Sequence, residues 1–229
     1  MGERQYHLQV GPGEVGSYLL LPGDPGRCAP IAERLEGARQ VAANREFTTY
    51  TGSLDGALVS VTSTGIGGPS TAIAVEELIK LGAQTLVRVG TCGALDPELG
   101  LGDVVVAQAA ARGEGTSAHY APEGFPAVAD LEVVVALREA AEAAGHRCRV
   151  GVVLSNDAFY AEMEPERFPL EGEIRARWSA WARAGCLAVE METATLLTVA
   201  RVRRVRAGAV LTVIDRVAGG LSGMPDPGR

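Results

Sequence analysis

The chain has few residues of the kinds that build metal centres and disulfide frameworks. Its 229 residues include four cysteines and three histidines, and no two cysteines form a C-x-x-C pair. A chain of this length can bury a full core without cross-links, so we expect reduced thiols and no zinc site. Aromatic residues are also scarce, at 5% of the chain, which draws attention to Phe159 and Tyr160.

Long apolar runs and a surplus of positive charge are missing as well. No segment reaches ~18 consecutive apolar residues, and the N-terminus lacks the apolar stretch of a signal peptide. The net charge of -7 argues against a surface for nucleic acid or anionic membranes. We therefore expect a cytoplasmic protein without nucleic-acid or membrane partners. Any anion site must be built from locally placed arginines.

Two common nucleotide-binding signatures are absent or misplaced. The chain contains no G-x-x-x-x-G-K-[ST] phosphate loop. Residues 11–16 spell G-x-G-x-x-G, but they precede the first predicted strand and contain Pro12. A dinucleotide fingerprint follows a strand and opens a helix. The sequence therefore favours neither a nucleoside-triphosphate hydrolase nor a dinucleotide-dependent enzyme.

Strand-like and helix-like segments alternate over the whole length. Short apolar segments rich in β-branched residues predict strands, and helical spacing of apolar residues predicts helices. The predicted strands are 17–21, 47–51, 57–62, 85–89, 103–107, 149–154, 187–191 and 207–214. The main predicted helices are 131–144, 173–184 and 193–204, and residues 112–129 read as a long loop. This order predicts one α/β domain, residues 1–229, folded as a three-layer αβα sandwich around a mixed, largely parallel sheet.

Three glycine-containing turns follow predicted strands, at residues 23–27, 65–68 and 90–93. Ligands of open α/β sheets lie at the carboxyl ends of the strands, so the turns are expected to converge on one site. Arg27 and Arg88 accompany two of them, and the third opens a helix whose first amides favour an anion. Together the turns predict a site for an anion the size of phosphate.

Arg88 has two interpretations that the residues alone leave open. It lies near the end of the apolar strand 85–89, just before a bend at 90–93 that carries the Thr91 hydroxyl. A buried guanidinium needs a partner of opposite charge. That partner is either an anionic ligand, which a guanidinium binds bidentately, or a buried carboxylate of the protein.

Carboxylates form the second notable group. Glu190 and Glu192 lie between a predicted strand and a predicted helix, and Asp215 ends the last strand. Glu192 is either a first-turn acid facing the helix dipole or an acceptor for the hydroxyls of a polyol. Asp215 is either a general acid, a helix cap or a partner of Arg216. Phe159 is either a core residue or a surface on which a flat ligand stacks.

Five blocks of sequence together resemble the nucleoside phosphorylase family. This family contains uridine phosphorylase, the bacterial hexameric purine nucleoside phosphorylases and archaeal enzymes acting on methylthioadenosine. The blocks agree with the family in order and spacing, and the most specific of them reads Ser-Thr-Gly-Ile-Gly-Gly-Pro-Ser-Thr-Ala-Ile, closed by Glu-Leu. They lie at residues 22–27, 63–73 with 77–78, 88–94, 157–160 and 189–192.

The resemblance implies a role for each matching position. Phosphate would be held by Gly23, Arg27, Arg88 and Thr91, with Arg45 from a neighbouring subunit. Ribose would contact Met191 and Glu192, with His7 from the neighbour, and the base would lie near Phe159, Cys92, Gly93 and Asp215. Asp215 and Arg88 would be the catalytic residues. Glu46, Ile66 and Ser70 match a monovalent-cation site of some uridine phosphorylases.

The implied activity is phosphate-dependent cleavage of the N-glycosidic bond of a ribonucleoside, in nucleoside salvage. Phosphate would be a co-substrate, with no metal or organic cofactor. The implied assembly is a homo-oligomer, a hexamer built as a trimer of dimers, with His7 and Arg45 donated across the dimer interface.

Departures from the family bear on the substrate. Uridine phosphorylases carry a Gln-x-Arg pair after Phe-Tyr, for which residues 161–167 offer no clear equivalent, while Asp215 matches the acid of purine-specific members. The sequence therefore leans towards purine nucleosides, with uridine phosphorylase as the alternative. A nucleosidase of the same fold and a non-catalytic nucleoside-binding protein are further alternatives. After Gly219-Gly220 the chain ends where family members usually continue into a final helix, so that helix is expected to be missing.

Overall fold

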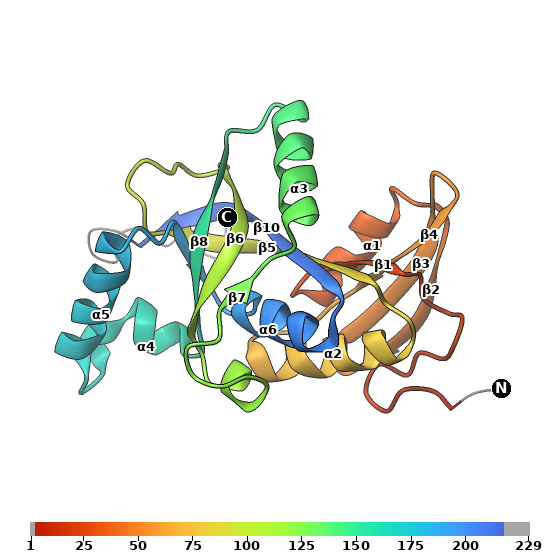
Figure 1. The fold of residues 1–229 in the computed structure, drawn as a ribbon, viewed down its shortest axis with the longest axis horizontal. Helices are drawn as coiled ribbons and strands as arrows, with labels where there is room; N and C mark the ends of the chain where they lie inside the picture. The colour runs from red at the N-terminus through yellow and green to blue at the C-terminus, as the bar shows by residue number, and fades with distance from the viewer. Residues whose placement is uncertain (1–2, 218–229) are drawn as a thin grey trace.

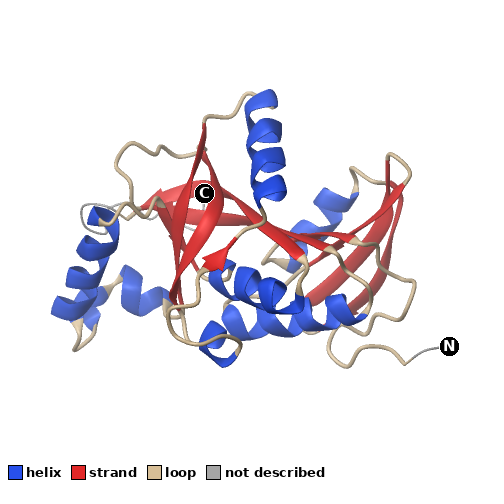
Figure 2. Cartoon of the chain, viewed as in Figure 1, coloured by secondary structure: helices blue, strands red, loops and turns tan. Residues whose placement is uncertain are grey.

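The fold is that of a mixed α/β protein, as the sequence predicts. A computed structural model describes residues 3–217 and contains one sheet of ten strands with helices on both sides (Figures 1 and 2). The expectation about a missing C-terminal helix concerns residues 218–229, which lie outside the described residues. Within 3–217, no helix is long and apolar enough to cross a membrane.

The strands are β1 Tyr18–Leu21, β2 Glu36–Asn44, β3 Phe47–Leu54, β4 Ala57–Thr62, β5 Thr85–Ala94, β6 Val104–Gly113, β7 Ala127–Val128, β8 Cys148–Asn156, β9 Ala188–Glu190 and β10 Arg206–Arg216. The α-helices are α1 Cys28–Ala32, α2 Gly68–Lys80, α3 Leu131–Ala143, α4 Phe159–Met163, α5 Glu171–Arg183 and α6 Thr193–Arg203. Short 3-10 turns lie at Pro25–Arg27, Thr116–His119 and Pro165–Arg167.

Strand β5 belongs to two parts of the sheet. On one side it pairs with β1, which leads through β4 and β3 to the edge strand β2. On the other side the pairings run from β5 to β10, β6, β8 and β9 and return to β5, so these strands close into a ring. Parallel and antiparallel pairings are equally numerous around this mixed sheet. The ring brings the ends of β5, β9 and β10 together.

Separate apolar clusters cover the two faces of the sheet. Leu86 of β5 and Leu211 of β10 pack with Leu78 of α2 and Leu197 of α6 in the largest cluster. Val104 and Val106 of β6 pack with Val134 of α3 in another. Figure 1 shows α3 on one side of the strands and α2 with α6 on the other. Burial of these alternating apolar side chains is the main force that holds the layers together.

Helix ends follow the signals in the sequence. The Asp130 side chain accepts hydrogen bonds from the amides of Glu132 and Val133 and so caps α3. Gly145 and Gly185, which follow α3 and α5, have φ of 79° and 89°, the left-handed conformation in which glycine commonly closes a helix. Local chemistry was therefore sufficient to locate these ends.

Two local expectations were wrong, and one strand was missed. The predicted bend at residues 90–93 is strand, because β5 continues to Ala94 along its parallel partner β10. Strand β2 was missed because its sequence is polar and lacks apolar alternation. The loop predicted at 112–129 contains the end of β6, a 3-10 turn and the short strand β7. In each case pairing across the sheet decided the conformation.

Glu77 of α2 fastens the segment before β1 to the core. Its carboxylate accepts hydrogen bonds from the amides of His7 and Leu8, at 3.0 and 2.8 Å, and lies 2.7 Å from His7 Nδ1. Burial by itself would raise the pKa of Glu77, but the hydrogen bonds from Leu8 and His7 outweigh it, so the pKa is lowered from its ordinary 4.5. The ionised carboxylate therefore stabilises the folded chain.

We expect Glu77→Gln to lower the melting temperature at neutral pH. The wild-type stabilisation is present above the ordinary pKa of 4.5 and is lost as the pH falls through the lowered pKa of the folded state. The difference between the two proteins should therefore shrink in acid. Thermal unfolding from pH 7 to pH 3 checks this, with Glu139→Gln on the exposed face of α3 as the matched control. A constant difference over that range would contradict the assigned role.

Candidate active site

The site centres on Arg88, which is 6% exposed in β5. In a strand, residues two apart point to the same face, so Gly90 lies beside the Arg88 side chain. A Cβ added to Gly90 would lie 2.9 Å from Arg88 Cζ. The missing side chain at Gly90 therefore provides the space that the guanidinium occupies. The sequence assigned Gly90 to a bend, whereas its role in the structure is to accommodate Arg88 within a strand.

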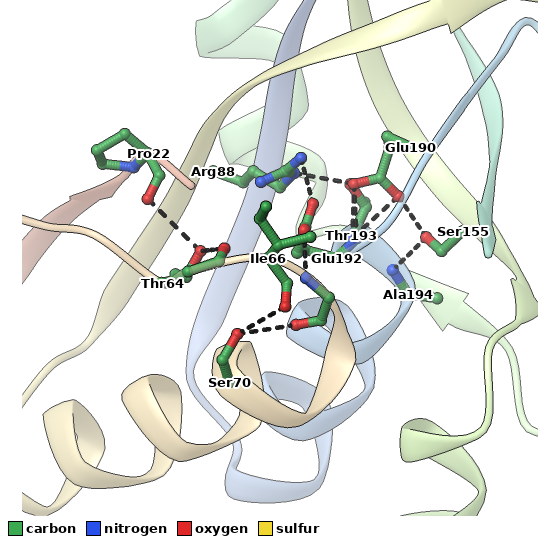
Figure 3. Close-up of polar contacts among 12 residues, drawn as sticks. Pro22, Thr64, Ile66, Ser70, Arg88, Ser155, Glu190, Glu192, Thr193 and Ala194 are labelled. Carbon is green, nitrogen blue, oxygen red and sulfur yellow. Dashed lines mark hydrogen bonds and ion pairs between the residues drawn. The ribbon is translucent and has the colours of Figure 1, made fainter. Parts of the chain in front are cut away.

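Two buried glutamates hold the guanidinium (Figure 3). Arg88 Nε lies 2.9 Å from Glu190 Oε2, and Arg88 NH2 lies 2.5 Å from Glu192 Oε2. The buried carboxylate that the sequence left open as a partner is thus present twice. One guanidinium facing two carboxylates gives the cluster a net negative charge.

Arg88 also points towards a second arginine. A Cβ placed on Gly23 would lie 3.8 Å from Arg27 NH2 and 3.9 Å from Arg88 NH1, so all three residues meet. Among the described residues, Arg88 NH1 forms no recorded hydrogen bond or ion pair, in contrast to Nε and NH2. The NH1 edge and Arg27 can therefore receive an anion beside Gly23, where a side chain is lacking.

Two of the three predicted glycine-containing turns meet, while the third, at 90–93, is part of strand β5. The amide of Gly65 donates to the carbonyl of Gly23 at 3.0 Å, which joins the turn after β1 to the turn after β4. Gly67, whose φ is 86°, donates its amide to Glu192 Oε1 at 2.5 Å at the start of α2. The anion at this helix end is therefore a carboxylate of the protein itself.

Burial dominates the ionisation of Glu192. It raises the pKa of this carboxyl above the ordinary 4.5, while Arg88 lowers it and the neighbouring Glu190 raises it. The raised pKa places the protonation of Glu192 closer to neutral pH than that of an exposed glutamate. Met191, next to it, is partly buried and lies between the two glutamates in the sequence.

Residues expected near the base lie further along the same strands. Asp215 faces Gly93 in the register of β10 and β5, next to an irregularity at Val213 and Asp215, and Gly93 also pairs with Val189 of β9. Asp215 Oδ1 accepts a hydrogen bond from the amide of Arg216. A Cβ on Gly93 would lie 2.6 Å from Val217, so the chain after β10 covers this glycine.

The thiol of Cys92 is buried rather than open to the site. Its Sγ donates to the carbonyl of Thr212 at 3.7 Å. Burial, and to a smaller extent Glu190, raise the pKa of Cys92 to about 12, so the thiol is neutral and unreactive. Phe159, at the start of α4, is 48% exposed and contacts Tyr160 edge to face. It is therefore available for stacking and is not a core residue.

Several predicted residues lie away from Arg88 in this chain. His7 lies against Glu77, and Arg45 is exposed in the turn between β2 and β3, with φ of 55°. Glu46 and Ser70 both lie near Gly65, where an added Cβ would be 2.7 Å from Glu46 Cγ and 3.1 Å from Ser70 Oγ. The Ser70 hydroxyl donates to the carbonyl of Ile66 at 3.0 Å (Figure 3). The structure thus brings together the three residues of the predicted cation site.

Sequence reasoning named Glu190 only as an acid in an apolar stretch and gave Ser155 no role. Glu190 is 6% exposed, and its carboxylate accepts from Arg88, from Ser155 and from the amides of Glu192 and Thr193. The signal that could have identified Glu190 is its position just before a predicted helix, where the first amides of the helix lack partners and a carboxylate can accept from them. No local pattern marks Ser155, because its contacts are distant in sequence.

Comparison with known proteins identifies the family of this chain. The model of the phosphorylase superfamily matches residues 17–226. A uridine phosphorylase of Treponema pallidum is 48% identical over 97% of this chain and 86% of that protein. A uridine phosphorylase of Escherichia coli is 46% identical over 91% of this chain and 85% of that protein. A guanosine phosphorylase of Halorubrum lacusprofundi is 42% identical over 95% of this chain and 86% of that protein.

Gly90→Ala should displace Arg88 without unfolding the chain. The added Cβ would meet Leu211 Cδ2 at 2.8 Å and Arg88 NH2 at 2.9 Å, both at ends of flexible side chains that can move. We expect the affinity for inorganic phosphate to fall about tenfold, because a misplaced charged donor loses roughly one good hydrogen bond. Titration calorimetry with phosphate measures this.

The matched control is Gly172→Ala in α5, where an added Cβ meets nothing within 4 Å. It should keep the affinity of the wild type. Unchanged phosphate affinity in folded Gly90→Ala protein would show that the guanidinium does not depend on the space at Gly90.

Proposed function

Because the chain belongs to the phosphorylase superfamily, we propose that it is a uridine phosphorylase, which cleaves uridine with phosphate to give uracil and ribose 1-phosphate. The observation that carries the proposal is the meeting of Gly23, Arg27 and the free edge of Arg88 in a protein of net charge -7. The names of the relatives from T. pallidum and E. coli support uridine. They do not support the lean towards purine nucleosides that Asp215 suggested.

Phosphate is the nucleophile in this proposal. Arg27 and Arg88 hold and orient it beside Gly23. Phosphorolysis passes through a transition state resembling an oxocarbenium ion, so the nucleophile must lie in line with the breaking bond. Fixing a dianion between two guanidinium groups is mainly a positioning effect. This accounts for a buried arginine whose NH1 atom has no partner among residues 3–217.

Glu192 and Met191 form the ribose side. An ionised carboxylate accepts hydrogen bonds from vicinal hydroxyls, and Glu192 lies next to the Arg88 guanidinium. Ribose held there would place its anomeric carbon near phosphate. The leaving base gains negative charge, so donors near it lower the barrier. Phe159 offers an exposed ring for stacking the base, and the backbone of Cys92 and Gly93 leads towards Asp215.

Guanosine is the second candidate substrate. The relative from H. lacusprofundi is named guanosine phosphorylase, and Asp215 is available as an acid at the base end.

The proposal includes a homo-oligomer. His7 and Arg45 lie away from Arg88 within one chain, so their proposed contacts with ribose and phosphate require a neighbouring subunit. Phosphate serves as co-substrate, and the proposed reaction needs no organic cofactor.

One assay tests the function directly. Purified protein is incubated with uridine, guanosine, inosine, adenosine or methylthioadenosine, with and without phosphate, and base release is followed. We expect uridine to be cleaved fastest and only when phosphate is present. Phosphate-independent cleavage would indicate a nucleosidase, absence of turnover a binding protein, and preferential cleavage of guanosine the second candidate.

The pH dependence of kcat/KM should reflect the ionisation of Glu192. Its pKa is raised by burial, and only the ionised form can accept the ribose hydroxyls. We therefore expect kcat/KM for the nucleoside to fall as the pH falls through this raised pKa. Glu192→Gln should have a higher KM for nucleoside and lack that acid limb. An identical acid limb in the variant would assign the titration to another group.

A further inference from the structure

Ser155 joins three elements through one hydroxyl. It is fully buried near the end of β8, and its Oγ donates to Glu190 Oε1 at the end of β9 (Figure 3). The same oxygen accepts a hydrogen bond of 2.9 Å from the amide of Ala194, in the first turn of α6. Ser155 is therefore held as both donor and acceptor, and its hydroxyl has one orientation that satisfies both partners.

Glu190 is the partner through which Ser155 reaches the site. Oε2 of Glu190 accepts from Arg88 Nε and from the amides of Glu192 and Thr193, each at 2.9 Å. Oε1 accepts from Ser155, and its other recorded donor within residues 3–217 is the Thr193 amide at 3.1 Å. Ser155 thus provides the only side-chain donor recorded for Oε1, and it fixes the plane of the carboxylate.

Glu190 and Glu192, the two glutamates that contact Arg88, have different roles in the proposed reaction. Glu192 would accept the ribose hydroxyls, which compete with its ion pair to Arg88 NH2. When ribose is bound, Glu190 is the carboxylate that still holds Nε and so sets the direction of NH1 towards Gly23. The orientation of Glu190 therefore decides where Arg88 presents its free edge to phosphate.

We propose that Ser155 is a positioning residue for the phosphate site, acting through Glu190 on Arg88. This inference rests on the proposed function. Loss of the hydroxyl leaves a buried carboxylate oxygen short of a donor and leaves the Ala194 amide without its recorded acceptor, which a buried group tolerates poorly. The carboxylate turns to recover a partner, and the guanidinium that it holds follows.

The test compares two buried serines. Ser155→Ala removes the proposed contact, and Ser60→Ala removes a fully buried hydroxyl of β4 that contacts the Gly16 amide and Thr51, outside the site. Inorganic phosphate binding is measured by calorimetry, and KM and kcat are measured for uridine and phosphate. We expect Ser155→Ala to weaken phosphate binding and raise the KM for phosphate about tenfold, the effect of one charge-assisted hydrogen bond. The kcat should change less.

Ser60→Ala should lower thermal stability while keeping wild-type phosphate parameters. Equal phosphate affinity in Ser155→Ala, Ser60→Ala and wild type would overturn the proposal. If Ser155→Ala fails to fold, Ser155→Cys retains a weak donor of similar size. Its phosphate affinity should lie between that of wild type and the tenfold weakening expected for the alanine variant. Wild-type affinity in Ser155→Cys would equally overturn the proposal.

Failure of the proposed function gives a different result. A wild-type protein that binds phosphate but does not cleave uridine refutes the function, while the calorimetric comparison of the variants still decides the role of Ser155. A wild-type protein that does not bind phosphate overturns both.

Discussion

A guanidinium removed from water is the constraint on which the rest of the site depends. Arg88 is almost completely buried, and such a charge is tolerated only with well-placed partners. Glu190 and Glu192 supply them, and Gly90 leaves the space. Two carboxylates against one cation leave an excess of negative charge, which Ser155 and four backbone contacts on the two glutamates relieve. The turn before α2, the end of β8 and the start of α6 are thereby fixed to one another.

The two interpretations of Arg88 that the sequence left open prove compatible. Its Nε and NH2 atoms make the structural ion pairs, and NH1 faces Gly23 and Arg27. A single guanidinium has enough donors for both purposes, because its five N–H groups point in several directions in one plane. The ion pairs orient the Arg88 side chain. The direction of NH1 towards Gly23 is therefore fixed before any ligand binds.

Much of the fold follows from local chemistry in the sequence. The predicted helix 131–144 agrees with α3 to within one residue, and the predicted apolar segments located β3, β4 and β10. The length of β5 was not predictable, because Gly90 and Gly93 read as a bend and only the register with β10 shows them to be strand. Strand β2 is stabilised by pairing with β3 and carries little apolar pattern of its own. Long-range pairing therefore accounts for what local patterns missed.

The candidate site was predictable where a residue type is costly to bury. Arg88 stood out for this reason, and the glycine turns indicated close backbone approach. Ser155 did not, because a serine in an apolar strand is common and its partners lie 35 and 39 residues away. The identity of the base was also not predictable from the sequence. Asp215 and the lack of a Gln-x-Arg equivalent suggested a purine, whereas the relatives from T. pallidum and E. coli are uridine phosphorylases.

Strand β5 carries both ends of the proposed site, and it is shared by the closed ring and the open part of the sheet. From Arg88 to Gly93 an extended strand spans about 16 Å. The distance between the anion end and the base end is therefore set by one continuous backbone. This backbone pairs with β10 throughout, and on its other edge with β1 up to Arg88 and with β9 from Gly93. Substitutions in the loops at either end can change the ligand, while the spacing between Arg88 and Gly93 along β5 stays the same.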